Sequence, residues 1–191
     1  METRALWFDE PGPANTAATL AAARERCEAL GLRDVVLAST TGKTAIAAAE
    51  AFAGSGANLV AVTLHAGLWE KYDPPDPDLV ARAQSLGVKF HTATHTLLGN
   101  LGTAIREKYG GTPDADLVAY TYYTLSQGFK VAVEVVAMAA DGNLIGMDAD
   151  VVGIGGSSYG ADTAVVMRPA YSTSFFDLKV REIICMPRKQ D

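Results

Sequence analysis

The sequence predicts an α/β fold, in which helices cover the faces of a sheet. Short runs made wholly of apolar residues, such as Val35–Ala38 and Leu59–Val62, are typical of strands buried on both faces of a parallel sheet. Segments with helical patterns separate these runs, and that alternation is the order of elements in α/β proteins. With 49% hydrophobic and 20% charged residues, the chain also has the composition of an ordinary globular domain.

The N-terminal half alternates between expected strands and expected helices. In chain order they are a strand over 5–8, a helix over 16–30, a strand over 35–38, a helix over 44–53, a strand over 59–62, a helix over 76–87 and a strand over 88–90. The turn sequence PGP stops the first strand. Asn15 or Thr16 is a candidate N-cap of the first helix, and Gly31 is its expected C-cap. Asp76, followed by a proline, starts the third helix.

The C-terminal half contains one segment that fits two structures. Helices are expected over 97–109 and 114–127, with two glycines between them. In the next segment, the alternating valines at 131, 133 and 135 suit a strand, whereas MAA followed by Gly142 suits a helix. Three strands are expected beyond residue 150, in VVGIGG, TAVVMRP and LKVREIICM.

Charge and cysteine content exclude several kinds of partner. The 16 basic and 22 acidic residues give a formal charge of −6, and there is no basic run, so nucleic acid and membrane are not expected as partners. No stretch of 18 apolar residues or apolar leader is present. Cys27 and Cys185 are far apart and are expected to be buried free thiols. We therefore expect a cytoplasmic protein.

Residues 36–44, VLASTTGKT, predict a phosphate-binding loop. Gly-Lys-Thr also ends a nucleoside-triphosphate P-loop, but that motif needs an earlier glycine where this chain has Leu37. No clear magnesium-binding partner follows, so an ATPase is not expected. Free amides at the start of the following helix, hydroxyl side chains and a lysine suit a single phosphate. The residues expected to hold it are Ser39, Thr40, Thr41, Gly42, Lys43 and Thr44. The alternative is an ordinary helix N-cap.

Several stretches together resemble a known family. They are FDEPGPANT (8–16), ASTTGKTA (38–45), VTLHAG (62–67), THTLLG (94–99), QGFKVAVEVVAMAADG (127–142), GADTAVVMRPA (160–170) and FFDLKVREIICMP (175–187). The chain resembles small stand-alone prokaryotic proteins similar to the C-terminal α/β domain of pyruvate kinase, which lack the kinase barrel. The resemblance implies one domain over 1–191, a three-layer sandwich around a mostly parallel sheet, and a helix over 129–141. It also implies an FMN-binding protein of unassigned reaction that is not a kinase.

Two histidines are the first candidates for ligand contact. His65 and His95 follow predicted strands, and loops at the carboxyl ends of parallel strands line the ligand crevice of an open α/β sheet. Gly67 belongs to the same loop as His65 and joins the expected cofactor site. His91 is expected to be structural. No Cys or carboxylate stands at ligand spacing beside these histidines, so no metal is expected.

The ambiguous segment supplies three further candidates. Lys130 and Glu134 would share a helix face, either as a surface salt bridge or with Lys130 placing positive charge near a flavin ring. Met138 packs either on the ring or in the core. Asp141 binds either a ligand hydroxyl or local backbone amides.

Two loops could also take part. GIGGSSYGAD (153–162) either brings its backbone and the side chains of Ser157, Ser158 and Asp162 to a ligand or is a mobile hairpin loop. Trp69 and Tyr72 either form a lid over the crevice or contact another subunit.

Three functions are consistent with these patterns. The first is a homo-oligomeric FMN-binding domain with possible redox chemistry on a small substrate, in which His65, His95 and Lys130 are the catalytic candidates. The second is a non-catalytic sensor of a sugar phosphate or nucleotide. The third is an oligomeric assembly module.

Overall fold

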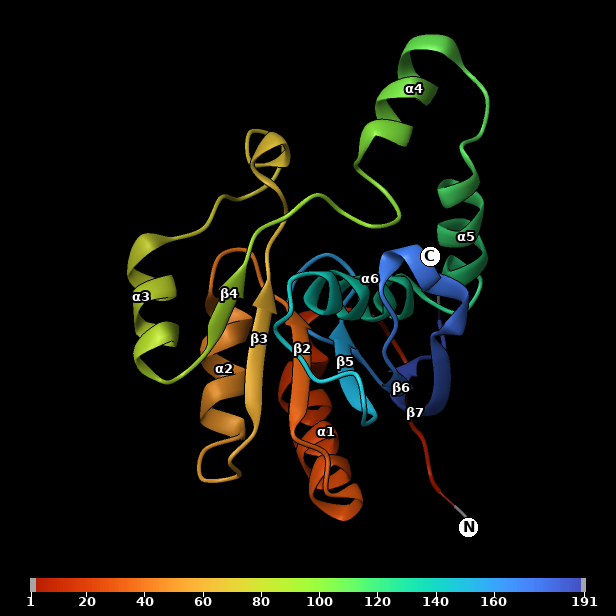
Figure 1. Cartoon of the computed structure of the whole chain (residues 1–191). Coiled ribbons are helices and arrows are strands. Elements are labelled where there is room, and N and C mark those ends of the chain that lie inside the picture. Colours follow the sequence, from red (N-terminus) through yellow and green to blue (C-terminus); the bar gives the residue numbers. More distant parts are fainter. Residues whose placement is uncertain (1–2, 190–191) are drawn as a thin grey trace.

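Residues 3–189 are described by a computed structural model, in which the strands form one sheet of order β1-β7-β6-β5-β2-β3-β4 (Figure 1). The strands are β1 Leu6–Phe8, β2 Asp34–Ala38, β3 Asn58–Val62, β4 Lys89–His91, β5 Val151–Gly155, β6 Thr163–Arg168 and β7 Lys179–Pro187. β6 pairs antiparallel with both neighbours, and the other pairs are parallel. The sheet is therefore mostly parallel, as expected.

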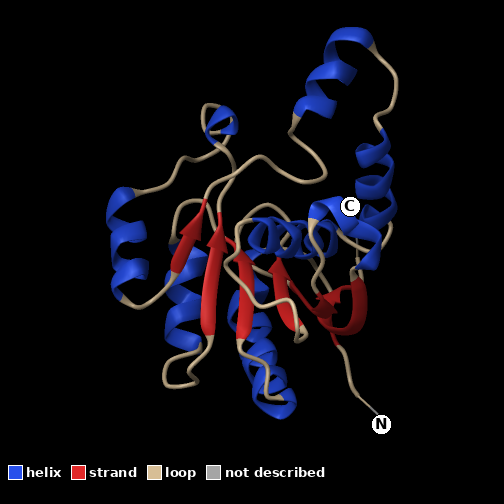
Figure 2. Cartoon of the chain, in the orientation of Figure 1, coloured by secondary structure: helices blue, strands red, loops and turns tan. Residues whose placement is uncertain are grey.

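Helices lie on both faces of this sheet (Figure 2). They are α1 Thr16–Leu30, α2 Lys43–Ala51, α3 Pro77–Ser85, α4 Leu101–Tyr109, α5 Asp114–Tyr123 and α6 Gln127–Asp141, with 3-10 helices η1 Pro13–Asn15, η2 Ala66–Leu68 and η3 Ser172–Asp177. Within residues 3–189, no helix has the length and apolar character needed to cross a membrane.

Alternate residues of the strands belong to two separate hydrophobic cores, one on each face of the sheet. Val35 and Leu37 of β2 pack with α1 and α2, whereas Val36 between them packs with α6. Successive side chains of a strand point to opposite faces, so a strand that is buried on both faces must be apolar throughout. The three layers predicted for the fold are confirmed.

The chain reverses direction across the sheet at β2. From β2 it moves outward to β3 and β4, and it then returns to β5 on the other side of β2. In open α/β sheets this switch point opens a crevice outside the carboxyl ends of the strands. The loop 39–42, which follows β2, and the loop 156–162, which follows β5, both lie there.

The segment that fitted both a strand and a helix forms a helix, α6. It lies across the sheet and contacts β2, β3, β5 and β6 (Figure 1). Twelve of its 15 residues are buried, Lys130 and Glu134 among them, so burial covers nearly every side of the helix. At its C-terminal end, Gly142 packs against the ring of His91, and Asn143 rather than Gly142 takes the left-handed conformation, with φ 54°.

Two helix ends differ from expectation because side chains cap the helices elsewhere, and one expected cap is not formed. The helix expected over 97–109 begins only at Leu101, where Asn100 accepts from the amide of Gly102. The helix expected over 114–127 ends at Tyr123, and Ser126 caps α6 by accepting from Phe129. Asn15 precedes α1, but its amide donates to the carbonyl of Glu10 instead of capping the helix.

Candidate functional site

The loop after β2 is built by its hydroxyl side chains. Ser39 Oγ accepts a hydrogen bond from the amide of Ala45 at 3.1 Å. Thr40 Oγ1 accepts one from the amide of Leu64 at 2.9 Å, which ties this loop to the loop after β3. Thr41 Oγ1 lies 3.4 Å from the amide two residues further along. Ser39 therefore acts partly as the cap foreseen by the alternative interpretation, while each hydroxyl keeps its proton to donate.

Further donors of this loop have no acceptor within the described chain. The amides of Gly42 and Thr44 have none, and the exposed ammonium of Lys43 has no ion-pair partner among residues 3–189. Gly42, at φ 97°, occupies the left-handed region that favours glycine. These donors sit at the N-terminus of the nine-residue helix α2, where the helix dipole favours an anion.

Neighbouring loops form the walls of this site. A Cβ on Gly42 would meet Leu79 of α3 at 3.0 Å, so α3 packs directly on the loop. The amide of Asp76 donates to the carbonyl of Thr41 at 3.4 Å. Tyr159, on the loop after β5, donates to Asp73 Oδ2 at 3.2 Å and so connects that loop to the segment preceding α3.

His65 and His95 form a close pair. Their ring centroids are 5.0 Å apart in an edge-to-face arrangement. His65 Nε2 donates to the carbonyl of Gly99 at 2.6 Å, and His95 Nδ1 donates to that of Leu98 at 3.1 Å. A carbonyl oxygen can only accept, so in each neutral ring the other nitrogen is left as an acceptor.

Burial lowers the pKa of His95 below its ordinary value of 6.5. The Glu134 carboxylate opposes this effect, while Lys130 and His65 lower the pKa further. His95 is therefore a neutral imidazole at pH 7.

Lys130 and Glu134 form an ion pair inside the molecule, not on its surface. Each residue is only 4% exposed, and Lys130 Nζ donates to one Glu134 oxygen. The other oxygen accepts from the amides of Leu97 and Leu98, at 2.7 and 3.0 Å. Lys130 also lies 5.9 Å from the ring centre of Tyr123. The alternative of a surface salt bridge is wrong in its location, because the loop that carries His95 covers α6 at this point.

The remaining candidates fall in different places. Gly67 lies against His65, since a Cβ there would meet the imidazole at 3.1 Å. Met138 is 2% exposed and belongs to the core under α6. Asp141 accepts from the amide of Ser172 at 2.9 Å and so holds η3. The structure thus brings His65, Gly67 and His95 together but assigns Met138 and Asp141 to packing and to a loop contact.

The glycine-rich loop borders a cavity of about 670 Å³ at the N-terminus of α6. Ser157 and Ser158 line this cavity together with Ser126 and Gln127. Asp162 is fully buried and does not line it, because its oxygens accept from the amides of Gly12 and Ser157 and from the hydroxyl of Thr163.

The two aromatic residues of the 64–76 segment differ in their surroundings. Trp69 Nε1 donates to the carbonyl of Leu64 at 2.8 Å, which fixes the loop after β3. Tyr72 is exposed, and Lys71 lies over its ring.

No protein-family model matches the chain. Among solved structures it is similar to pyruvate kinases from Cryptosporidium parvum. One matches with a TM-score of 0.43 and 14% identity over 83% of this chain and 23% of the kinase. A second matches at 0.42 and 13%, over 84% and 24%. A third, in complex with ADP, matches at 0.39 and 14%, over 92% and 25%. The chain spans about a quarter of the length of these kinases.

Sequence reasoning missed two features of the site. It did not foresee that Glu134 would hold the loop that carries His95, although a carboxylate in the apolar middle of the helix was the available signal. The contact between Tyr159 and Asp73 had no signal, since the residues are 86 positions apart in exposed loops.

Cys27 and Cys185 are buried free thiols, as expected, and burial raises the pKa of Cys27 to about 12 and that of Cys185 to about 11. Among residues 3–189, no three His, Cys, Asp or Glu side chains gather as a metal site.

Proposed function

We propose that this chain binds FMN and holds its phosphate in the loop Ser39–Thr44. The observation that carries the proposal is the set of donors at the start of α2. Three hydroxyl protons, the amides of Gly42 and Thr44, and the Lys43 ammonium have no acceptor among the described residues. All of these groups are donors, which is what a phosphate monoester requires.

The length of the loop favours one phosphate over a chain of them. Only residues 39–42 separate β2 from α2, and the packing of Leu79 against Gly42 limits the space around the loop. A triphosphate P-loop is longer and wraps its backbone around the β-phosphate. A ligand with one terminal phosphate, such as FMN, therefore fits this loop better than ATP does.

His65 and His95 are the proposed contacts for the flavin ring. The bond from the Leu64 amide to Thr40 places the loop that carries His65 beside the loop Ser39–Thr44, and His95, on the loop after β4, contacts the ring of His65. Each imidazole donates one N–H to a backbone carbonyl, and in a neutral ring the other nitrogen is free to accept a hydrogen bond. When bound, FMN would supply hydride or electron transfer, so any reaction would be a redox reaction on a small substrate. The charge of Lys130 is balanced by Glu134, so we assign the ring contact to the histidines instead.

Titration with FMN tests this proposal. We expect flavin fluorescence to change on binding to the full chain, and the Lys43→Ala variant to bind roughly 10-fold more weakly, because a charge-assisted contact is lost. Lys89→Ala is the matched control, because Lys89 is an exposed lysine on β4. Absence of FMN binding by the wild-type chain would overturn the proposal. Equal weakening of FMN binding in the two variants would show that the loop Ser39–Thr44 does not hold the phosphate.

A second candidate is a non-catalytic sensor of a sugar phosphate or nucleotide. The neutralised Lys130–Glu134 pair favours it, because a balanced ion pair offers no net charge to stabilise a reduced flavin. The melting temperature should then rise with a phosphorylated metabolite, and Lys43→Ala should reduce that rise. A panel of sugar phosphates and nucleotides that leaves the melting temperature unchanged would exclude the sensor.

A further inference from the structure

Helix α4 has an apolar side that nothing in the described chain covers. Leu101, Ile105 and Tyr109 are spaced by four residues and are 75%, 46% and 75% exposed. None of its nine residues is buried, and its main packing partner is α5. It projects beyond the sheet (Figure 1). Helices shorter than about 12 residues are marginal in water, so α4 needs a partner to be stable.

The C-terminal end of α4 carries one cation that no ion pair holds. Arg106 and Lys108 stand there against the single carboxylate of Glu107. Arg106 pairs with Asp116 of α5. Lys108 lies over the ring of the neighbouring Tyr109 and has no ion-pair partner among residues 3–189. The uncovered side of α4 therefore combines an apolar stripe with a free cation at one end.

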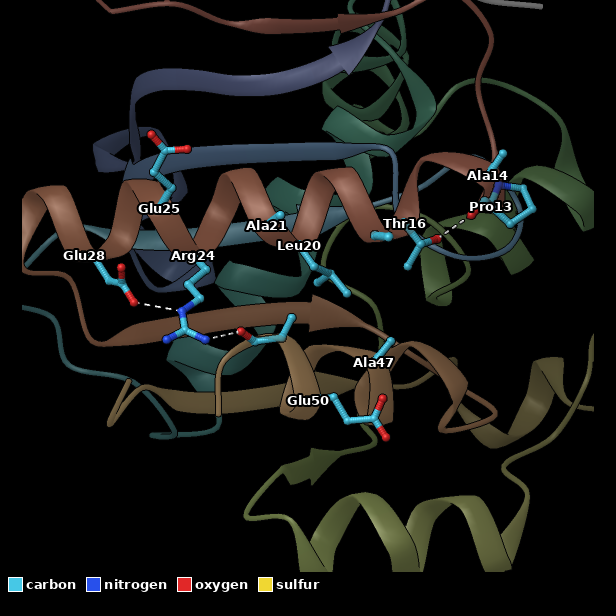
Figure 3. A pocket seen from close by; sticks show the side chains of 12 residues that line it. Pro13, Ala14, Thr16, Leu20, Ala21, Arg24, Glu25, Glu28, Ala47 and Glu50 are labelled. Atoms are coloured by element: carbon cyan, nitrogen blue, oxygen red, sulfur yellow. Dashed lines mark hydrogen bonds and ion pairs between the residues drawn. The ribbon is translucent and has the colours of Figure 1, made fainter. Parts of the chain in front are cut away.

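A groove of about 670 Å³ lies between α1 and α2, on the face of the sheet opposite α6 (Figure 3). Small side chains line it, including Ala17 and Ala21 of α1 and Ala47 of α2. Arg24 closes one end, where it donates to Glu28 at 2.8 Å and to the carbonyl of Ala51 at 2.7 Å. Alanines keep the groove shallow and open, so a neighbouring helix could approach closely.

The groove is acidic, whereas α4 carries a free cation. Glu25, Glu28 and Glu50 line it, against the single cation of Arg24. Glu28 is neutralised by Arg24, and Glu50 by an exposed contact with Arg82. Glu25 has no ion-pair partner among the described residues. In Figure 3 the Glu25 side chain lies on the side of α1 away from α2, so the groove offers an apolar floor with an unpaired carboxylate at its outer rim. These features complement the apolar stripe and the free cation of α4.

We propose that α4 of one copy docks in the α1–α2 groove of a second copy. Leu101 and Ile105 would cover the alanine floor, and Lys108 would lie at its acidic rim. The two surfaces are on different parts of the molecule, so α4 cannot dock in the groove of its own copy. The contact is heterologous, and repetition of it gives a closed ring or an open chain of copies.

Sedimentation of the full chain tests the proposal with two blocking variants. Ile105→Glu places a charge in the apolar stripe, and Ala21→Trp fills the groove. We expect each variant alone to sediment as a 20.1 kDa monomer at concentrations where the wild-type chain is assembled. The matched controls are Leu117→Glu on α5 and Ala18→Trp on α1, two exposed positions outside the contact. Both controls should assemble as the wild type does, and circular dichroism checks that every variant is folded.

Mixing the two blocked variants tests whether α4 of one copy binds the groove of another. One of them keeps an intact groove and the other keeps an intact α4, so an equimolar mixture should form a 1:1 dimer and nothing larger. The proposal is overturned by a monomeric wild-type chain, by a mixture that stays monomeric, or by Ala21→Trp assembling normally while Ile105→Glu does not. The last result would show that α4 pairs with another α4.

Discussion

At the scale of single residues, the pair Lys130–Glu134 shows how a charge is kept inside an apolar layer. Both side chains are 4% exposed, and the carboxylate receives the ammonium together with two backbone amides. A buried charge is tolerated when its hydrogen-bonding capacity is met in this way. The same carboxylate fixes residues 97 and 98, and the carbonyl of Leu98 in turn orients His95.

Replacing Lys130 by Met should destabilise the fold strongly. The substitution leaves the Glu134 carboxylate buried without its cation, and breaking such a pair costs about 3–5 kcal/mol. Urea unfolding measures the change. Arg82→Met, which removes the exposed pair with Glu50, is the control and should cost less than about 1 kcal/mol. Similar losses in the two variants would contradict the buried pair.

His95 should make stability depend on pH below neutrality. Its folded pKa is lowered from 6.5 mainly by burial, so the unfolded chain binds more protons below that pH. The free energy of unfolding should therefore be fully present above pH 6.5 and fall as the pH drops toward the folded pKa. His95→Asn, which can keep the bond to Leu98, should flatten this dependence between pH 7 and 5. An unchanged slope in the variant would rule His95 out as the cause.

At the scale of elements, α6 lies unusually close to β5. A Cβ on Gly155 would overlap the carbonyl of Gly128, and one on Gly128 would overlap the side chains of Asp162 and Thr163. These two glycines let a helix cross directly over the strand ends. Periodicity alone did not decide α6, because Val131, Val133 and Val135 also alternate as they would in a strand.

Gly155→Ala should therefore disrupt the contact between α6 and β5. The added methyl group meets backbone atoms that cannot rotate away, and we expect a loss of about 3 kcal/mol or more in chemical unfolding. Gly146→Ala is the comparison, because a Cβ there meets only Asp34 Oδ2, at 3.5 Å, and should cost less than about 1 kcal/mol. Equal stability of the two variants would mean that α6 can shift without cost.

At the scale of the whole molecule, the order of the strands assembles the candidate site. β2 lies between β3 and β5, so the loops after all three meet at one edge of the sheet. The Thr40–Leu64 and Tyr159–Asp73 hydrogen bonds then join loops that are distant in sequence. α4 extends from this edge with little packing of its own, whereas α5 packs on α6.

Local stability should differ across the molecule, because the helices differ in how much of their surface is buried. Amide hydrogens of α4 should exchange fastest among the helices, and those of α6 slowest, because α4 buries no residue and α6 buries twelve. Hydrogen exchange followed by mass spectrometry measures this difference. If α4 docks on a second copy, its protection should rise with protein concentration in the wild type but not in Ile105→Glu. Strong protection of α4 in that variant would contradict its lack of internal packing.

The sequence by itself determined the α/β class, the buried strands and the short hydroxyl-rich loop between β2 and α2, whose binding of a phosphate stays a prediction. These depend on local properties: an apolar run of four or five residues, turn residues that stop it, and hydroxyls at a helix start. The two histidines were placed at one edge by the rule that parallel strands end together. Each of these inferences uses residues that are close in the chain or a regularity of the fold class.

Only the tertiary structure decided what surrounds those residues. It buried the Lys130–Glu134 pair, assigned Met138 to the core, and moved the start of α4 to Leu101, where Asn100 caps the helix. It also showed α4 uncovered and a groove open between α1 and α2. The physical reason is that burial and hydrogen-bond partners depend on segments far apart in sequence, and no local pattern specifies which of them meet.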